Sequence, residues 1–255
     1  MDIFFLGNNR LGWQALSWLR EQGEQVVGIA VHPEGKSKFR EEIVDAAGLP
    51  DDRIFDGSSL EDPEVMGRIR SIVPDIGISV LFGYILRPAF FEIFPRGCVN
   101  LHTSYLPYNR GANPNVWSII EGTPAGVTLH EIDAGVDTGA ILAQDTVDVE
   151  PVDTGQSLYL KLEEAALELF TRTWPALKEG KLTPEPVDPD EGTSHRVRDL
   201  EAVGEIDLDR TYKARELIDL IRARTFPPYP GAYFEAGGRR VYLRLDLQYG
   251  EEEEP

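Results

Sequence analysis

The stretch that decides the fold class is residues 3–31, IFFLGNNRLGWQALSWLREQGEQVVGIAV. Its apolar residues change from a short continuous run to helical spacing and back to a short β-branched run, which predicts a strand, a helix and a second strand. The same alternation continues through the first part of the chain, with strands at 3–6, 26–31 and 76–81 and helices at 11–20 and 65–73. It predicts an α/β fold with a Rossmann-like, mostly parallel sheet and helices on both faces.

Segments rich in Pro, Gly and Asp mark the loops and the domain boundary. They predict a loop at 50–57 and a boundary in KLTPEPVDPDEGTSH, residues 181–195. We therefore expect a large domain at 1–183, a linker at 184–204, a small carboxyl-terminal module at 205–250 and a solvated acidic tail at 251–255.

The expected module contains a helix and a hairpin. Residues 212–224 form an amphipathic pattern with Leu217, Ile218 and Ile221 on one face. Two strand-like runs follow, joined by Gly237 and Gly238, which is a hairpin signal.

Composition places the chain among ordinary globular proteins. It has 255 residues, 42% hydrophobic and 27% charged, enough for a full core. The single cysteine, Cys98, excludes an internal disulfide and fits a reducing compartment. No apolar run reaches the length of a membrane span, and the first strand begins without a basic leader, so we expect a cytoplasmic protein with no membrane partner. The net charge of −19 repels polyanions and argues against a nucleic-acid partner.

Residues 98–145, CVNLHTSYLPYNRGANPNVWSIIEGTPAGVTLHEIDAGVDTGAILAQD, bring together an amide, an imidazole and a carboxylate. Asn100 and His102 are two residues apart, so a strand points them to the same side, with His102 at the carboxyl end where α/β sheets bind ligands. The Asn100 amide and a protonated His102 can stabilise an oxyanion, and a neutral imidazole, with a pKa of about 6.5, can take a proton from an attacking amine. Asp137, in the turn at 135–139, is placed to orient His102 and favour its charged form.

Several motifs in this block resemble those of the folate-dependent formyltransferases. Ser104-Tyr105-Leu106-Pro107 is similar to the family's Ser-Leu-Leu-Pro, Arg110-Gly111-Ala112-Asn113-Pro114 to its Arg-Gly-x-x-Pro, and Gly126-Val127-Thr128 to its Gly-Val-Thr strand. The resemblance covers about residues 1–180 and is strongest at 97–144. It implies that Asn100, His102 and Asp137 are the catalytic residues. His130 lies in a strand pattern, so we expect it to pack or to form hydrogen bonds.

The resemblance also implies a site for N10-formyltetrahydrofolate as co-substrate, and no metal. A pterin needs a flat slot whose backbone groups read its edge, and a glycine permits that approach. The loop after the strand at 76–81 and the loop at 132–135 would form this pocket, with Phe82, Gly83, Tyr84, Ile85, Leu86, Asp133 and Gly135 as the binding residues.

Residues 7–12, GNNRLG, open a helix after the first strand. They form either a tight turn with a helix cap or an anion site at the helix amino end, and they lack the middle glycine of the dinucleotide fingerprint. In the relatives that act on glycinamide ribonucleotide this loop is richer in small residues, which argues against that substrate. We expect the acceptor to be bound by Asn8, Arg10, Thr103, Ser104, Arg110 and Asn113.

The expected reaction is formyl transfer to the amine of a nucleotide-linked amino sugar. Residues 225–234, TFPPYPGAYF, resemble the short carboxyl-terminal module of sugar N-formyltransferases, which implies a homodimer through this module, whereas tRNA-acting relatives carry a larger barrel domain. Methionyl-tRNA formylation is the first alternative. The second is hydrolysis of formyltetrahydrofolate, although hydrolase relatives have an additional amino-terminal domain. An NAD-dependent oxidoreductase or a non-catalytic binding module would use a similar sheet, but the incomplete fingerprint and the Asn-His-Asp set argue against them.

Overall fold

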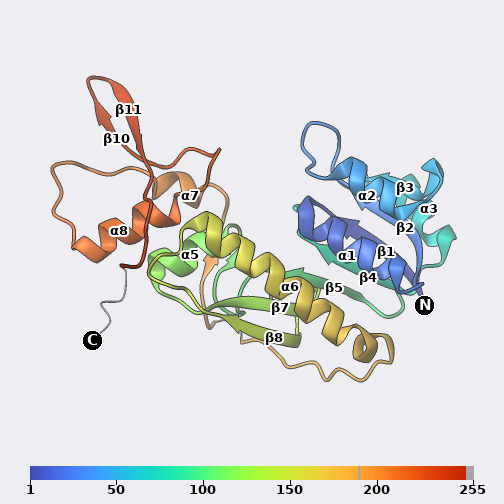
Figure 1. Cartoon of the computed structure of the whole chain (residues 1–255). Helices are drawn as coiled ribbons and strands as arrows, with labels where there is room; N and C mark the ends of the chain where they lie inside the picture. Colours follow the sequence, from blue (N-terminus) through green and yellow to red (C-terminus); the bar gives the residue numbers. More distant parts are fainter. Residues whose placement is uncertain (189, 251–255) are drawn as a thin grey trace.

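The architecture comes from a computed structural model that describes residues 1–188 and 190–250. A seven-stranded sheet with the order β3-β2-β1-β4-β5-β7-β8 forms the body of the protein (Figure 1). The first five strands in this order are parallel, and the last two are antiparallel to their neighbours. The strands are β1 (Asp2–Gly7), β2 (Gln25–Val31), β3 (Ile54–Asp56), β4 (Ile76–Val80), β5 (Cys98–His102), β7 (Ala125–Glu131) and β8 (Ile141–Val147).

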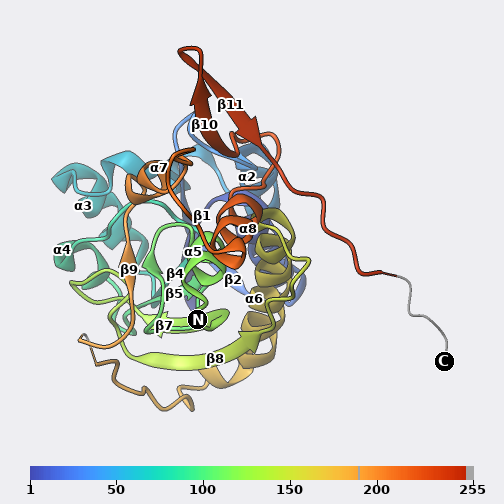
Figure 2. The same cartoon turned by 90° about the vertical axis from the view of Figure 1, so that its left-hand side faces the viewer.

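Helices cover both faces of this sheet, as predicted. Figure 2 shows α3 and α4 on one side of the sheet and α6 on the other. The helices of this body are α1 (Asn9–Glu21), α2 (Arg40–Ala47), α3 (Pro63–Ile72), α4 (Pro88–Phe91), α5 (Pro114–Glu121) and α6 (Gly155–Lys178), with short 3-10 turns η1 (Asp51–Arg53) and η2 (Gly57–Ser59). The 24-residue α6 begins with a capping box in which Thr154 and Ser157 satisfy each other's backbone N–H groups.

Each face of the sheet has its own apolar core. On one face, apolar side chains of α1, α2 and α6 pack on the strands, with Leu16, Leu162 and Phe170 among the fully buried residues. On the other face, Phe4 packs with Phe90, Phe94 and Ile69 of the α3–α4 side. Burial on both faces explains why β1 and β4 read as continuous apolar runs.

The carboxyl-terminal part holds α7 (Asp199–Ala202), α8 (Ala214–Ala223) and a hairpin of β10 (Ala232–Ala236) and β11 (Arg239–Leu243). Gly237 and Gly238 both have positive φ, which a type I′ turn requires, so the hairpin prediction is confirmed. The hairpin projects away from the sheet body in both views (Figures 1 and 2). The range expected to be a linker is held against the body, because β9 (Ser194–His195) pairs in parallel with β6 (Arg110–Gly111).

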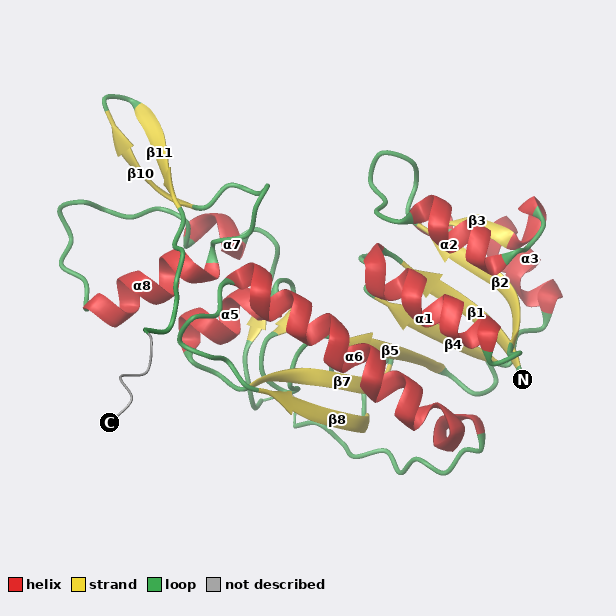
Figure 3. Ribbon diagram, in the orientation of Figure 1, coloured by secondary structure: helices red, strands yellow, loops and turns green. Residues whose placement is uncertain are grey.

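Two local expectations were wrong. Residues 50–57 are not all loop, because β3 adds an edge strand there (Figure 3); three residues are too few to produce a periodic pattern. Ile218 does not belong to the buried face of α8. Leu217, Leu220 and Ile221 pack around Ile206, whereas Ile218 is exposed. The acidic tail at 251–255 lies outside the described residues.

Candidate active site

The strand order reverses between β1 and β4, so the carboxyl ends of these strands form the topological switch point of the sheet. Asn8, after β1, donates its backbone N–H to the Val80 carbonyl of β4 at 3.2 Å, which joins the two strand ends. The next strand in the sheet, β5, ends at His102. The loops after β1, β4 and β5 therefore lie along one edge of the sheet, where such folds bind ligands.

His102 is buried and held in one tautomer. The Asn109 backbone carbonyl accepts a hydrogen bond from its ring, whereas the buried Nε2 has no hydrogen-bond partner among the described residues. Because a carbonyl can only accept, the bonded nitrogen is Nδ1–H, and in the neutral ring Nε2 carries the lone pair. Burial lowers the pKa of His102 below its ordinary value, although Asp137 and the Asn109 carbonyl act in the opposite direction. The neutral imidazole therefore presents a free base at Nε2.

Asp137 faces the reactive nitrogen of His102. Its Oδ2 lies 3.5 Å from His102 Nε2, and its Oδ1 lies 3.5 Å from Nε2 of His130. Oδ2 also accepts the Gly111 backbone N–H at 2.8 Å. Burial would raise the pKa of the Asp137 carboxyl, but the two imidazoles and the Gly111 N–H outweigh it and hold the pKa well below its usual range. Asp137 is thus a fixed carboxylate beside the base.

This geometry changes one expectation about Asp137. We expected the carboxylate to orient the imidazole, as the acid of a Ser-His-Asp triad does from Nδ1. Here the Asn109 carbonyl fixes the ring, and Asp137 lies on the Nε2 side, where a proton taken from substrate would arrive. The carboxylate is placed to stabilise the imidazolium as it forms.

Asn100 is oriented by His130. The Asn100 Nδ2 lies 3.2 Å from His130 Nε2, and His130 Nδ1 donates to the Glu131 carbonyl at 2.8 Å. In a neutral His130 ring the Nε2 then accepts from the amide, which leaves the second N–H of Asn100 for another acceptor. The hydrogen-bonding role expected for His130 is confirmed: its partners are the Asn100 amide and the Glu131 carbonyl, and the Asp137 carboxylate lies 3.5 Å from its Nε2.

Taken together, these groups suit the attack of an amine on a carbonyl carbon. His102 Nε2 can accept the amine proton, Asp137 stabilises the charge that results, and the Asn100 N–H can donate to the carbonyl oxygen as it becomes negative. None of these steps needs a covalent bond to the protein.

The residues predicted to bind the co-substrate lie on two loops, one after β4 and one after β7. Phe82 and Tyr84 make ring contacts with His32 at the end of β2, and the Gly83 N–H donates to His32 Nε2 at 3.1 Å. Ile85 is 67% exposed, whereas Leu86 is buried in the core beside Phe90. Leu86 can therefore contribute backbone groups to a pocket but not its side chain.

The second loop, after β7, is folded on itself. Asp133 Oδ1 accepts the Gly135 N–H at 3.0 Å and the Thr138 hydroxyl at 2.7 Å, so this carboxylate shapes its own turn. Ile132 packs against the apolar core that contains Leu86, which brings the two predicted loops together. Val136 is exposed on the same loop.

The predicted acceptor residues divide into exposed and enclosed groups. Arg10 donates from Nε and Nη2 to Glu163 at 3.1 and 2.7 Å, so a carboxylate already neutralises it, while 41% of its side chain stays exposed. Asn8 accepts the Lys38 backbone N–H at 3.0 Å. Thr103 and Ser104, which follow His102 in the chain, are almost fully buried.

Arg110 and Asn113 belong to the loop that follows β5. Arg110 starts β6, and its backbone N–H donates to Thr193 at 3.0 Å. Asn113 has a left-handed backbone and precedes α5, where its carbonyl accepts the Val116 N–H. The loop also supplies the Asn109 carbonyl and the Gly111 N–H described above.

Four contributors to the site were not predicted. The Asn109 carbonyl and the Gly111 N–H are backbone groups, which no residue type reveals. His32 lies 51 residues from its partner Gly83. Of these groups, only Lys38 could have been found from the sequence, because it is a cation in a predominantly acidic chain. Its ammonium contacts the hydroxyl and ring of Tyr229 in the carboxyl-terminal part.

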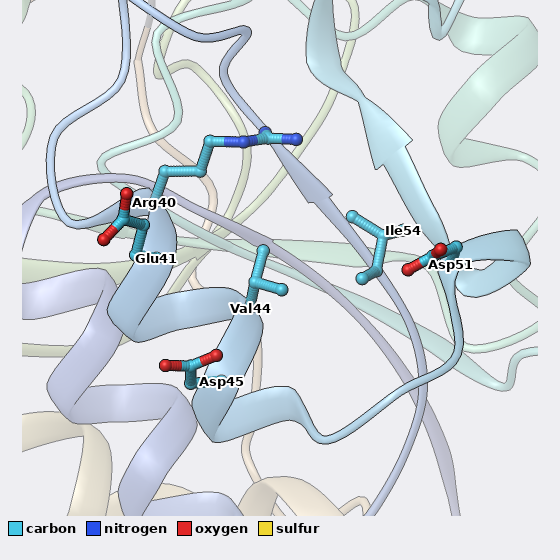
Figure 4. Close-up of a pocket in the computed structure, with 6 residues that line it drawn as sticks. All are labelled: Arg40, Glu41, Val44, Asp45, Asp51 and Ile54. Atoms are coloured by element: carbon cyan, nitrogen blue, oxygen red, sulfur yellow. The ribbon is translucent and has the colours of Figure 1, made fainter.

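A surface hollow of about 480 Å³ lies between α2 and the start of β3 (Figure 4). It is lined by Arg40, Glu41, Val44, Asp45, Asp51 and Ile54. None of the predicted site residues line this hollow, so it is separate from the His102 site. Within residues 1–188 and 190–250, no cluster of three or more His, Cys, Asp or Glu is arranged to hold a metal. In the same part of the chain, no helix combines the length and apolar character of a membrane span.

Comparisons with known proteins agree on one family. A family model described as formyl transferase matches residues 3–173, and one described as the N-formyltransferase dimerization C-terminal domain matches 199–249. A methionyl-tRNA formyltransferase of Geobacter metallireducens is 31% identical over 95% of this chain and 78% of its own length.

Solved structures are similar over most or nearly all of the chain. A 4-N formyltransferase from Francisella tularensis has a TM-score of 0.81 and 28% identity, and covers 97% of this chain and 98% of its own. A formyltransferase from Anoxybacillus kamchatkensis, solved with UDP-4,6-dideoxy-4-formamido-L-AltNAc and tetrahydrofolate, has a TM-score of 0.57 and 30% identity, with coverage of 79% and 89%.

Proposed function

The chain belongs to the formyl transferase family, and on this premise we propose that it moves the formyl group of N10-formyltetrahydrofolate to the amine of a nucleotide-linked amino sugar. The observation that carries the chemistry is the unpartnered Nε2 of buried, neutral His102, 3.5 Å from the Asp137 carboxylate. The acceptor is the part of the proposal that the experiment below tests.

The two loops after β4 and β7 fit a folate. Their exposed apolar side chains, Ile85 and Val136, can contact a pterin face, and the exposed backbone at Gly83 can approach its hydrogen-bonding edge. Leu86 and Ile132 pack in one core and hold the loops as a pair. When bound, the co-substrate supplies the formyl group.

The residues of this chain then perform the transfer. Neutral His102 takes a proton from the amine as its nitrogen attacks the formyl carbon, and the Asn100 N–H donates to the formyl oxygen. Asp137 stabilises protonated His102, which can return the proton to the departing nitrogen as the old carbon–nitrogen bond breaks. Proton and charge are balanced over the cycle.

The distribution of charge supports a small anionic acceptor. The chain carries a net charge of −19, and binding of a nucleic acid needs several cationic contacts because each phosphate contact releases counterions. A diphosphate needs only a few such cationic contacts. Lys38 lies beside Asn8 and contacts Tyr229, and Arg10 is partly exposed in the first turn of α1, directly after Asn8, so these residues are the candidates for binding the anion.

The carboxyl-terminal module supports the same proposal and suggests a homodimer. Residues 199–249 match a module described as a dimerization domain of N-formyltransferases. Exposed apolar side chains are present on α8 and on the hairpin, namely Ile218, Val241 and Tyr242. We propose that these side chains contribute to the contact between two copies of the chain.

Methionyl-tRNA formylation is the second candidate because relatives 31–35% identical to this chain carry that name. The two candidates are separated by incubating the enzyme and N10-formyltetrahydrofolate with either initiator methionyl-tRNA or a panel of dTDP-, UDP- and GDP-linked 3- and 4-amino sugars. Turnover of one or more sugar nucleotides, with little formylation of the tRNA, is the expected result. Efficient formylation of the tRNA with no turnover of any sugar nucleotide overturns the proposed acceptor.

A further inference from the structure

The catalytic pair is held by one short loop. The Asn109 carbonyl accepts from His102, and the Gly111 N–H donates to Asp137 at 2.8 Å. Two residues of this loop therefore set the orientation of the base and the position of the carboxylate. A change in the loop moves both groups together.

This loop is itself bound by a segment from outside the catalytic domain, residues 192–195. The Thr193 hydroxyl accepts the Asn109 N–H at 2.9 Å and lies 3.1 Å from the Asn109 side-chain oxygen, to which it donates. The Thr193 carbonyl accepts the Arg110 N–H at 3.0 Å, and the His195 carbonyl accepts the Ala112 N–H at 2.9 Å. The segment thus follows the loop as a short parallel strand.

The two backbones are in close contact. A Cβ atom on Gly111, whose φ is +89°, would lie 2.2 Å from the His195 carbonyl oxygen. A Cβ on Gly192, whose φ is +77°, would lie 2.0 Å from the Pro107 carbonyl oxygen. Both distances are too short for any side chain, so glycines at both positions permit this approach.

The far end of the segment is anchored on α5. The His195 ring stacks on Trp117 with centroids 3.9 Å apart and planes within 7°, and His195 Nε2 lies 3.2 Å from the Glu121 carboxylate. Residues 192–195 are therefore held at both ends, by Asn109 at one end and by α5 at the other. A segment held in this way can keep the loop after β5 in one position.

We propose that residues 192–195 position the catalytic pair, with Thr193 as the positioning residue that acts through Asn109 on His102. The proposal rests on the proposed roles of His102 and Asp137 in formyl transfer. Asn109 is fully buried, and its side-chain amide also donates to Ser118 and Thr123 at 2.9 and 2.8 Å, so these bonds hold its side chain. The hydroxyl of Thr193 is the side-chain group that satisfies its backbone N–H.

The test compares Thr193→Val, which keeps the shape and removes the hydroxyl, with Thr193→Ser, which keeps the hydroxyl. Thr183→Val, at an exposed threonine of the same chain region, is the matched control. We expect Thr193→Val to lower kcat by about tenfold or more, since misplacement by about 1 Å can cost on the order of a hundredfold, with both KM values nearly unchanged. Thr193→Ser and Thr183→Val should stay close to the original enzyme.

A second readout follows His102 directly. Nitrogen-15 NMR of the imidazole reports the Nδ1–H tautomer without any acceptor present, so it also separates this proposal from the identity of the substrate. Thr193→Val should weaken the Nδ1–H signature, and Thr193→Ser should retain it. If Thr193→Val does not fold, Thr193→Ala takes its place. Equal losses in the Ser and Val variants, a loss that appears only in KM, or an unchanged His102 signature in the variant that lacks the hydroxyl overturns the proposal.

Discussion

Replacement of Asp137 by Asn removes a charge while keeping the shape of the side chain. At the 3.5 Å that separates Asp137 Oδ2 from His102 Nε2, a unit-charge interaction is about 4–5 kcal/mol for an effective dielectric constant of about 20. If the whole of this energy stabilised the transition state, its loss would lower the rate of formyl transfer by about three orders of magnitude. The carboxylate is shared with His130 and the Gly111 N–H, so we expect a smaller loss, about a hundredfold in kcat.

The sign of the accompanying pH effect follows from the same geometry. His102 must be neutral to accept a proton, so the rate falls as pH drops through its pKa. Burial already lowers the pKa of His102, and the Asp137 charge partly compensates. Loss of that charge lowers the pKa of His102 further, and the acidic limb of the kcat/KM profile should move to lower pH even though the maximum rate is reduced.

The assay is the pH profile of formyl transfer for the original chain, Asp137→Asn and Asp148→Asn. Asp148 is an exposed aspartate that follows Asp137 in the chain. Its replacement by Asn removes the same charge and so controls for a general change in charge. Circular dichroism and a thermal melt check the fold of each variant. An acidic limb that stays in place while the rate of Asp137→Asn falls would refute the coupling of this carboxylate to His102.

Three further outcomes are expected. His102→Ala and Asn100→Ala should each lower kcat by about a hundredfold or more with little change in folate binding, and near-normal turnover in steady-state assays would remove that residue from the mechanism. His32→Phe should raise the KM for formyltetrahydrofolate by about fivefold, the value of one net hydrogen bond, because the Gly83 N–H loses its acceptor; an unchanged KM would contradict this role. Burial lowers the pKa of both His32 and His102, so the unfolded chain binds protons more readily below about pH 6.5 and the free energy of unfolding should decrease as pH falls from there. Urea titrations at pH 7.5 and 5.5 measure this decrease, which should be smaller in His32→Phe.

The sequence predicted those parts of the protein that depend on local pattern. Strands with buried residues on both faces and helices with one apolar face are visible in a single chain, and Asn100 and His102 share a strand face because side chains alternate. What could not be predicted depends on partners distant in sequence. Arg10 pairs with Glu163, 153 residues away, and no local pattern indicates that partner. The short edge strand β3 was missed because three residues form no period.

Backbone groups were also invisible to sequence reasoning. The carbonyl that His102 uses is present in every residue type, and the left-handed backbone of Asn109, with φ of +57°, is not visible in the sequence. The composition of residues 192–195, polar and rich in turn residues, indicates a linker. In the structure those same residues satisfy the backbone of the loop after β5.

The antiparallel addition of β7 to the parallel strands explains why the site forms beside β5. In the register of these two strands Asn100 lies directly opposite His130, and directly opposed residues of an antiparallel pair point to the same face. His102, two residues further along β5, has the same orientation, so all three polar side chains share one face of the sheet. The loop between β7 and β8 then brings Asp137 between the two imidazoles. A parallel strand in the place of β7 would run in the opposite direction. The loop that carries Asp137 would then begin at the opposite edge of the sheet. The direction of β7 therefore determines where the loop that carries Asp137 begins, beside Val99 of β5.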